Sequence, residues 1–208
     1  MTLTESLIAF TFAATLLTLT PGLDTALILR TATVEGSKKA FHAAFGIQVG
    51  CLIWGAMVAF GLGTLIAASE LAYNILKWCG AAYLCWLGLQ MILKPRTEMV
   101  MATSSQDAPK HQNWFLRGML GNVLNPKVGV FYVSFLPQFI PAGHSVVLWT
   151  YLLVLIHVVI GTVWSSTLIA ATRPLSRFLR RGPVVKWMDR TTGVLFLAFA
   201  ARLAFSRR

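Results

Sequence analysis

Two proline-interrupted apolar stretches hold the residues of this chain that could do chemistry. The first interruption reads Thr20-Pro21-Gly22-Leu23-Asp24. Pro21 removes a backbone donor and clashes with the preceding helical turn, and Gly22 lets the backbone leave helical geometry at low cost. Opened backbone groups in a membrane need new partners, and a carboxylate near mid-membrane costs roughly 2.5 kcal/mol or more. We therefore expect Asp24 to be paired or to serve in function.

The second interruption has similar chemistry with a charge of opposite sign. It reads Asn122-Val123-Leu124-Asn125-Pro126-Lys127. Pro126 is expected to open the helix, and the amides of Asn122 and Asn125 can satisfy or bind polar groups. Lys127 lies too far from either end of its apolar segment for its ammonium to reach the interface easily. A cation at this depth also needs a partner or a function.

Together, Asp24 and Lys127 suit a zwitterionic amino acid. Asp24 could bind the ammonium group or carry a proton, and Lys127 with the N-terminal amides of half-helices could bind the carboxylate. The alternative is an Asp24–Lys127 ion pair that only joins the two halves of the chain. At about 1.5 Å per helical residue, the two charges are expected at different depths unless the unwound turns compensate.

Other polar residues lie within apolar segments and have weaker assignments. Gln48 could face a cavity or bond to a neighbouring helix, and the sequence does not separate these roles. His157 could relay protons, although a hydrogen-bonded structural histidine is the commoner case. Thr15, Thr18 and Thr20 are expected to bond to the backbone of their own helix.

The composition is that of a membrane protein. Of the 208 residues, 56% are hydrophobic and 12% are charged, which is about half the charged share of a soluble domain. Crossing the hydrocarbon takes about 20 helical residues, and about six segments qualify. We expect them over 6–29, interrupted at Pro21-Gly22, and over 40–68, 71–93, 114–140, interrupted at Pro126, 146–172 and 191–205. Met1–Ser6 carries no Lys or Arg, so we expect no cleavable signal peptide.

Most of the 18 Lys and Arg residues lie in alternate loops. The first, third and fifth loops are basic, whereas the second and fourth carry no Lys or Arg. This alternation predicts that the odd loops are cytoplasmic and the N-terminus is outside. It also explains the net charge of +11 without nucleic-acid binding. Arg202, Arg207 and Arg208 do not fit, because six spans would place them outside.

The two halves of the chain share one plan. Each has three expected spans and begins with a proline-interrupted segment, and because three is odd, the halves enter the membrane from opposite sides. We therefore predict an all-α integral membrane protein built as two inverted three-helix repeats, over 1–94 and 114–208, joined by a cytoplasmic linker over 95–113. Gly46 and Gly50 form a G-x-x-x-G pattern that suits close helix packing, within the chain or in a homodimer.

The cysteines give little support to a metal or redox site. Cys51, Cys79 and Cys85 all lie in apolar segments, and no two form a C-x-x-C pair. Small buried hydrophobic residues are the default interpretation for such cysteines, and we expect no bound metal.

Several pieces of the sequence, taken in order, are typical of one family. They are Thr20-Pro21-Gly22-Leu23-Asp24, Lys77-Trp78-Cys79-Gly80-Ala81-Ala82-Tyr83-Leu84 with Trp86-Leu87-Gly88, and, between Phe115 and Phe139, Arg117-Gly118, Asn122, Asn125-Pro126-Lys127 and Phe135-Leu136-Pro137-Gln138-Phe139. As a set they resemble the LysE/RhtB family of bacterial amino-acid exporters, over most of the chain. The sequence departs at Leu23, where the family usually has a second proline.

The resemblance implies a secondary carrier that exports amino acids or close derivatives across the bacterial inner membrane. Such a carrier would need no cofactor and would be driven by the proton motive force, and the chain has no G-x-x-x-x-G-K-[ST] motif. The predicted substrate or proton ligands are Asp24, Lys127, Asn122 and Asn125, and the site-shaping residues are Pro21, Gly22, Pro126 and Gln48. The competing hypothesis is a non-transporting membrane scaffold with a structural Asp24–Lys127 pair. The sequence does not rank threonine-like, leucine-like or basic substrates.

Overall fold

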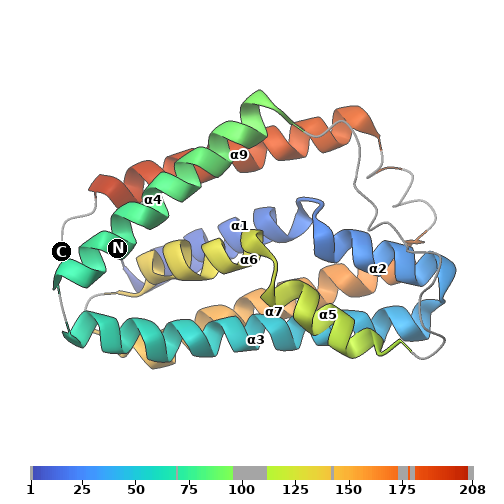
Figure 1. Cartoon of the computed structure of the whole chain (residues 1–208), viewed down its shortest axis with the longest axis horizontal. Helices are drawn as coiled ribbons and strands as arrows, with labels where there is room; N and C mark the ends of the chain where they lie inside the picture. Colours follow the sequence, from blue (N-terminus) through green and yellow to red (C-terminus); the bar gives the residue numbers. More distant parts are fainter. Residues whose placement is uncertain are drawn as a thin grey trace.

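The computed structural model describes residues 2–68, 70–95, 112–141, 143–172, 178 and 181–205, and all regular secondary structure among them is helical (Figure 1). The predicted all-α class is thereby confirmed. The helices are α1 (Leu3–Leu19), α2 (Leu23–Val34), α3 (Ser37–Ala68), α4 (Glu70–Leu93), α5 (Trp114–Val123), α6 (Pro126–Val130), α7 (Val146–Ala170) and α9 (Gly182–Phe205). Beyond α6, the chain forms a π-helical turn (Phe131–Phe135) and a 3-10 turn (Leu136–Phe139). Most of the predicted linker, Arg207, Arg208 and the side chain of Arg202 lie outside the described residues.

The first predicted interruption is present and bends the chain. α1 ends at Leu19, and Thr20 and Gly22 both have extended backbones before α2 begins. The axes of α1 and α2 differ by 51°. Because Pro21 has no amide hydrogen and disfavours a helical conformation in the residue before it, Thr20 is forced out of the helix at this point.

The second predicted interruption lies just before Pro126. α5 ends at Val123, and Asn125 has an extended backbone and caps α6 by accepting a hydrogen bond from Lys127 N through its side-chain oxygen. Pro126 occupies the first turn of α6, where a missing amide hydrogen is tolerated. Pro126 therefore starts the short helix that carries Lys127.

Two of the described helices are long and apolar enough to cross a membrane by themselves. They are α3, over Ser37–Gly61, and α7, and the bent pair of α1 and α2 passes the same test when taken together. On α7, the exposed side chains include Leu148, Val159 and Val163, whereas Thr150 and His157 are buried. This polarity is the reverse of a soluble helix and suits a lipid environment. The prediction of about six spans remains a prediction for the other helices.

Glycines allow the helices to approach closely inside the chain. A Cβ on Gly46 would lie 2.0 Å from the carbonyl oxygen of Phe115, and a Cβ on Gly118 would lie 2.0 Å from that of Ala43. The predicted G-x-x-x-G pattern therefore packs α3 onto α5, and the homodimer stays a prediction. α3 also contacts α7, while α4 pairs with α9 along a separate edge (Figure 1).

The sixth predicted segment, over 191–205, was too short. α9 begins at Gly182, and Pro183 lies in its first turn, where proline is tolerated. Lys186 and Arg190 made this stretch resemble a loop, but both lie on the helix. Its buried residues recur every three or four positions, at Val185, Asp189, Thr192, Phe196 and Ala200. The first segment was also underestimated, because α2 continues to Val34 and includes Arg30.

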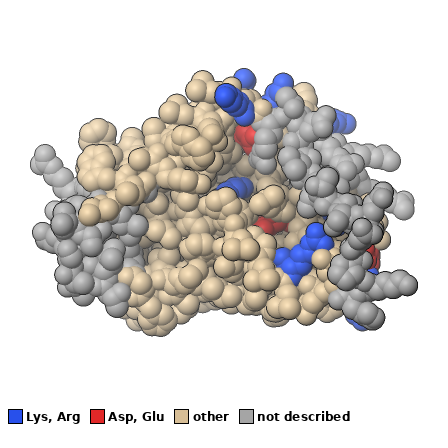
Figure 2. All heavy atoms as spheres, viewed as in Figure 1, with Lys and Arg blue, Asp and Glu red and all other residues tan. Residues whose placement is uncertain are grey.

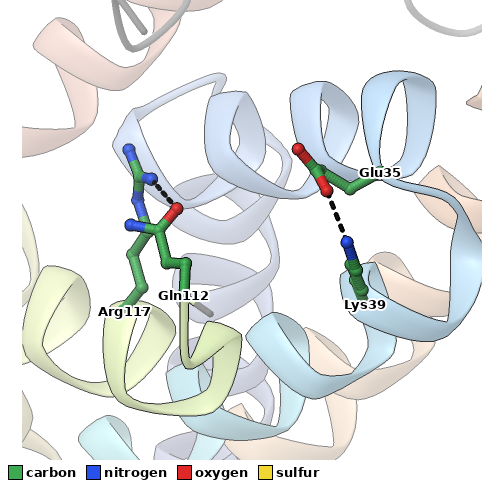
Figure 3. Close-up of polar contacts among 4 residues, drawn as sticks. All are labelled: Glu35, Lys39, Gln112 and Arg117. Atoms are coloured by element: carbon green, nitrogen blue, oxygen red, sulfur yellow. Dashed lines mark hydrogen bonds and ion pairs between the residues drawn. The ribbon is translucent and has the colours of Figure 1, made fainter. Parts of the chain in front are cut away.

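The charged side chains visible on the described surface gather in one half and the centre of the face shown in Figure 2. At that end of the molecule α2 turns into α3 and α5 begins. Lys39 Nζ lies 2.6 Å from Glu35 Oε2, and Arg117 Nη1 donates to Gln112 Oε1 at 2.7 Å (Figure 3). The concentration of charge at one end agrees with the basic, cytoplasmic side that we predict for these loops.

Candidate functional site

The two helix interruptions meet at one cavity of about 70 Å³. The predicted site residues that line it are Gly22, Asp24, Gln48, Asn122, Asn125 and Lys127. Pro21 and Pro126 line a neighbouring cavity. A Cβ on Gly22 would lie 3.6 Å from Lys127 Nζ, so the ammonium lies beside the first interruption. Asp24 and Lys127 therefore line one cavity, although simple helix geometry predicts different depths for them.

Asp24 lies in the first turn of α2, and its two carboxylate oxygens have different surroundings. Its Oδ2 accepts a hydrogen bond from Asn122 Nδ2 at 2.9 Å. Its Oδ1 is buried and has no hydrogen-bond partner within the part of the chain that the structure describes. The positive end of the α2 dipole also favours a negative charge here. The carboxylate can therefore accept a further donor, such as an ammonium group.

Lys127 provides hydrogen-bond donors to the backbone at the C-terminal end of α1. Its Nζ donates to the carbonyl oxygens of Leu17 and Thr20, both at 2.9 Å. In an uninterrupted helix, the carbonyl of Leu17 would accept from the amide of residue 21, and Pro21 has no amide hydrogen to give. Neither of these two hydrogen bonds joins Lys127 to Asp24. The cation thus stabilises the interruption in the opposite half of the chain.

Asn122 and Asn125 have different positions relative to the charges. Asn122 is 1% exposed and lies between Asp24 and Cys51, whose thiol donates to Asn122 Oδ1 at 3.7 Å. Its amide therefore orients the Asp24 carboxylate directly. Asn125 lines the cavity, but its side-chain oxygen is used to cap α6.

Gln48 and His157 contribute to the same cavity from α3 and α7. Gln48 is buried, and its amide lies over Gly161, where a Cβ would be 2.9 Å from Oε1. Of the two roles open to Gln48, the structure therefore gives the one that faces the cavity. His157 Nδ1 is hydrogen bonded to Tyr132 OH at 2.9 Å, which is the structural role expected for it. The hydroxyls of Thr15, Thr18 and Thr20 bond to backbone oxygens one turn earlier, as predicted.

A second cavity, of about 260 Å³, lies on the side of the interruptions that faces α4 and α9. It shares Gly22, Asn125 and Lys127 with the first cavity. Asp189 of α9 also lines it and is only 1% exposed. The sequence interpretation missed Asp189 because it placed the start of the last helix too late. The regular spacing of the buried residues on α9 was the signal that could have revealed it.

The sequence was compared with known proteins. The model of the LysE type translocator family matches residues 15–207. The homoserine/homoserine lactone efflux protein of Salmonella typhimurium is 31% identical over 199 residues, or 96% of each chain. The leucine efflux protein of Klebsiella pneumoniae is 30% identical, covering 95% of this chain and 93% of its own length. The threonine efflux protein of Escherichia coli is 29% identical, covering 91% and 92%. No solved structure matches the chain.

These matches extend over nearly the whole chain, so both helix interruptions lie within the region that the family model matches. The family consists of membrane translocators, so the residues around the cavity belong to a transport protein and not to an enzyme. On this evidence the chain belongs to the LysE type translocator family.

Proposed function

We propose that this protein is a secondary carrier that exports amino acids or close derivatives across the bacterial inner membrane, driven by the proton motive force. The observation that carries the proposal is the cavity at which the carboxylate of Asp24 and the ammonium of Lys127 lie beside two helix interruptions. Relatives of 29–31% identity are named as efflux proteins for homoserine, leucine and threonine. Ionisable side chains within the membrane-spanning part of a protein commonly mark a transport path.

The cavity matches the two charged groups of an amino acid. The substrate ammonium binds Oδ1 of Asp24 once the walls of the cavity separate, and the substrate carboxylate approaches Lys127 and the first amides of α2. A volume of about 70 Å³ holds a few water molecules but is smaller than a usual ligand pocket. Entry of a substrate therefore requires the walls to separate. The larger cavity across Lys127 gives the substrate a continuation toward α4 and α9.

The carrier would be built as two inverted repeats, over 1–94 and 114–208, joined by a cytoplasmic linker. Two contacts support this layout: α3 packs against α7, and α4 packs against α9, so that corresponding helices of the two halves meet. A two-fold axis that passes between the repeats would relate the two helices of each such pair. Rocking of one half against the other would then expose the cavity to alternate sides of the membrane.

Export can be measured from proteoliposomes or cells loaded with amino acids, comparing wild type with Asp24→Asn and Lys127→Met. Both variants should insert normally and lose export, whereas Glu35→Gln, which removes a partly exposed acid outside the cavity together with its ion pair to Lys39, should retain it. Export at the wild-type rate by both cavity variants would refute the site. A protonophore should abolish uphill export if protons drive it, and persistence of that export would refute the coupling.

The scaffold hypothesis gives a different pattern. If the charged residues only hold the two halves together, wild-type protein in vesicles would move no amino acid across a panel of neutral, acidic and basic substrates. Asp24→Asn and Lys127→Met would then lower the unfolding temperature without changing any flux.

A further inference from the structure

Four phenylalanine side chains form a closed cluster beside the small cavity. Phe10 belongs to α1, whereas Phe131, Phe135 and Phe139 belong to the π-helical and 3-10 turns that follow α6. The ring centroids lie 5.9 Å apart for Phe10 and Phe131, 4.9 Å for Phe131 and Phe135, 4.8 Å for Phe135 and Phe139, and 5.6 Å for Phe139 and Phe10. Each of these side chains is at most 2% exposed. The rings of this phenylalanine cluster are therefore in direct contact, and a polar solute cannot pass between α1 and the turns while they stay so.

The phenylalanine cluster borders the cavity on one side. The ring of Phe131 contacts that of His157, which lines the cavity, at a centroid distance of 5.4 Å. Along α1, Phe10 lies two helical turns before Leu17, another residue of the cavity lining, which corresponds to about 10 Å. The cluster therefore lies next to the cavity, toward the N-terminal end of α1.

The other side of the cluster lies toward the outer surface of the predicted topology. Phe139 precedes the loop over 141–145, which carries no Lys or Arg, and its carbonyl accepts a hydrogen bond from the hydroxyl of Ser6 near the start of α1. We expect both this loop and the N-terminus outside. α1 and the segment after α6 run side by side toward this end in Figure 1, away from the half in which the charged side chains gather in Figure 2. A substrate that leaves the cavity toward the outside would therefore meet the phenylalanine cluster.

The segment that carries three of the four rings is bounded by two breaks in helical geometry. Asn125 and Ile140, which flank the stretch over 126–139, both have extended backbones. Between them the chain changes from an α-helix to a π-helical turn and then to a 3-10 turn, and such turns often mark hinges and functional sites. Residues at the ends of an element can absorb the backbone rotation of a hinge motion. The segment over 126–139 can therefore tilt away from α1 about its two ends.

We propose that the phenylalanine cluster is the outer gate of the carrier, closed in this structure, and that tilting of the segment over 126–139 opens it by separating Phe10 from the other three rings. The proposal rests on the proposed transport function. Lys127 lies in the first turn of the same segment and donates to the carbonyl oxygens of Leu17 and Thr20 at the end of α1. A substrate carboxylate that draws Lys127 away from these carbonyls would loosen the segment from α1 at its inner end, so that substrate binding favours opening.

Closure of the gate can be measured by the access of a thiol reagent to the cavity. Thr18→Cys is the reporter, because Thr18 lines the cavity and is not one of the residues proposed to bind the substrate. It is introduced into a protein without native cysteines, made by Cys51→Ala, Cys79→Ala and Cys85→Ala. Right-side-out and inside-out vesicles are treated with a charged methanethiosulfonate that does not cross the membrane, and the labelling rate is measured from each side.

The labelling rates are compared among three variants of this reporter protein. Phe10→Leu and Phe135→Leu keep an apolar side chain but each remove two ring contacts of the gate. Phe45→Leu is the control, because the ring of Phe45 pairs with that of Phe115 at 5.8 Å but is 65% exposed and lies outside the cluster.

From the outside, labelling should be about 10-fold faster in the two gate variants than in their parent, since the lost ring contacts favour the closed state. From the cytoplasmic side, all variants should label at the parent rate, and Phe45→Leu should match the parent from both sides. A variant that has lost its fold would instead label faster from both sides, which distinguishes damage to the fold from an open gate.

A second experiment locks the gate. Phe10→Cys and Phe139→Cys are combined in the cysteine-free protein without the Thr18→Cys reporter, and the two thiols are joined by a short reagent with a methanethiosulfonate group at each end. Cross-linking should lower amino-acid export about 10-fold or more, because opening is then blocked, and reduction should restore it. Each single variant treated with the same reagent should retain most of its export.

Two results would overturn the gate. One is outside labelling that stays at the parent rate in both leucine variants, or that rises only from the cytoplasmic side. The other is full export by the cross-linked protein. The labelling experiment needs no substrate and so separates the gate from the proposed function. If wild type exports no amino acid in the panel, the transport proposal fails, and the labelling rates alone decide whether the phenylalanine cluster seals the cavity.

Discussion

The ammonium of Lys127 donates a hydrogen bond to the carbonyl oxygen of Thr20 at 2.9 Å, directly before the first helix interruption. Together with the bond to Leu17, it supplies donors that the backbone around Pro21 cannot provide. The charge of one half of the chain thus stabilises the unwound backbone of the other. A substrate carboxylate that attracts Lys127 would release this helix end, which couples substrate binding to the shape of the interruption.

Lys127→Met should therefore lower stability as well as transport. The substitution keeps an unbranched side chain but leaves two buried carbonyl oxygens without their donor, and hydrogen bonds to charged groups contribute on the order of 1.5–3 kcal/mol each. The unfolding temperature of the purified protein in detergent should fall measurably. Lys127→Arg retains a donor and should recover part of the loss. An unchanged unfolding temperature in Lys127→Met would show that these bonds do not stabilise the interruption.

Asn122 should tolerate almost no change, because it donates to the carboxylate of Asp24. Asn122→Asp replaces that donor with a second carboxylate and should abolish export, since two like charges would share a buried site. Cys51→Ala removes only the weak thiol bond to the other end of the same amide and should have a small effect. The export rates of the two variants, each normalised to the amount of inserted protein, are compared with that of the wild type. Equal losses would mean that packing around Asn122 matters more than its bond to Asp24.

The helix interruptions could be predicted from sequence because their cause is local. Pro21 and Pro126 disrupt helix geometry through their own rings, whatever surrounds them. Asp24 and Lys127 stood out for the same reason, since a charge in an apolar segment is costly wherever it packs. The residue types at each interruption therefore identified the charged residues of the cavity and the asparagines beside them, but not the rest of the lining.

The partners of these residues could not be predicted, because they depend on tertiary structure. Lys127 was expected to face Asp24 or a substrate, and only the fold shows that it bonds to the end of α1. The contacts that close the phenylalanine cluster are likewise invisible in the sequence. Asp189 was missed because Lys186 and Arg190 made the first turns of α9 look like part of a basic loop. Its burial also could not be predicted, because it depends on packing against other helices.

Gly118→Ala should separate α3 from α5. The added Cβ would lie 2.0 Å from the carbonyl oxygen of Ala43, which belongs to rigid helix backbone and cannot move aside. Overpacking of this kind costs about 1–3 kcal/mol or more. Gly121→Ala on the same helix is the control, because its Cβ would meet no atom within 4 Å. It should be neutral or stabilising, by up to about 1 kcal/mol, as alanine favours helix over glycine. Equal unfolding temperatures for the two variants would contradict the close contact between α3 and α5.

Asp189→Asn should impair export without preventing insertion. Asp189 is only 1% exposed and lines the larger cavity together with Lys127, while its neighbour on α9, Thr192, is hydrogen bonded to Thr20. If the proposed substrate route continues from the first cavity toward α4 and α9, this acid lies beside it. Replacing it with the amide keeps its volume, so the export rate should fall by about 10-fold or more, equivalent to about 1.4 kcal/mol. Glu35→Gln again serves as the control acid. If Asp189→Asn exports at the wild-type rate but unfolds at a lower temperature, the residue holds α9 in place and the larger cavity is not part of the substrate route.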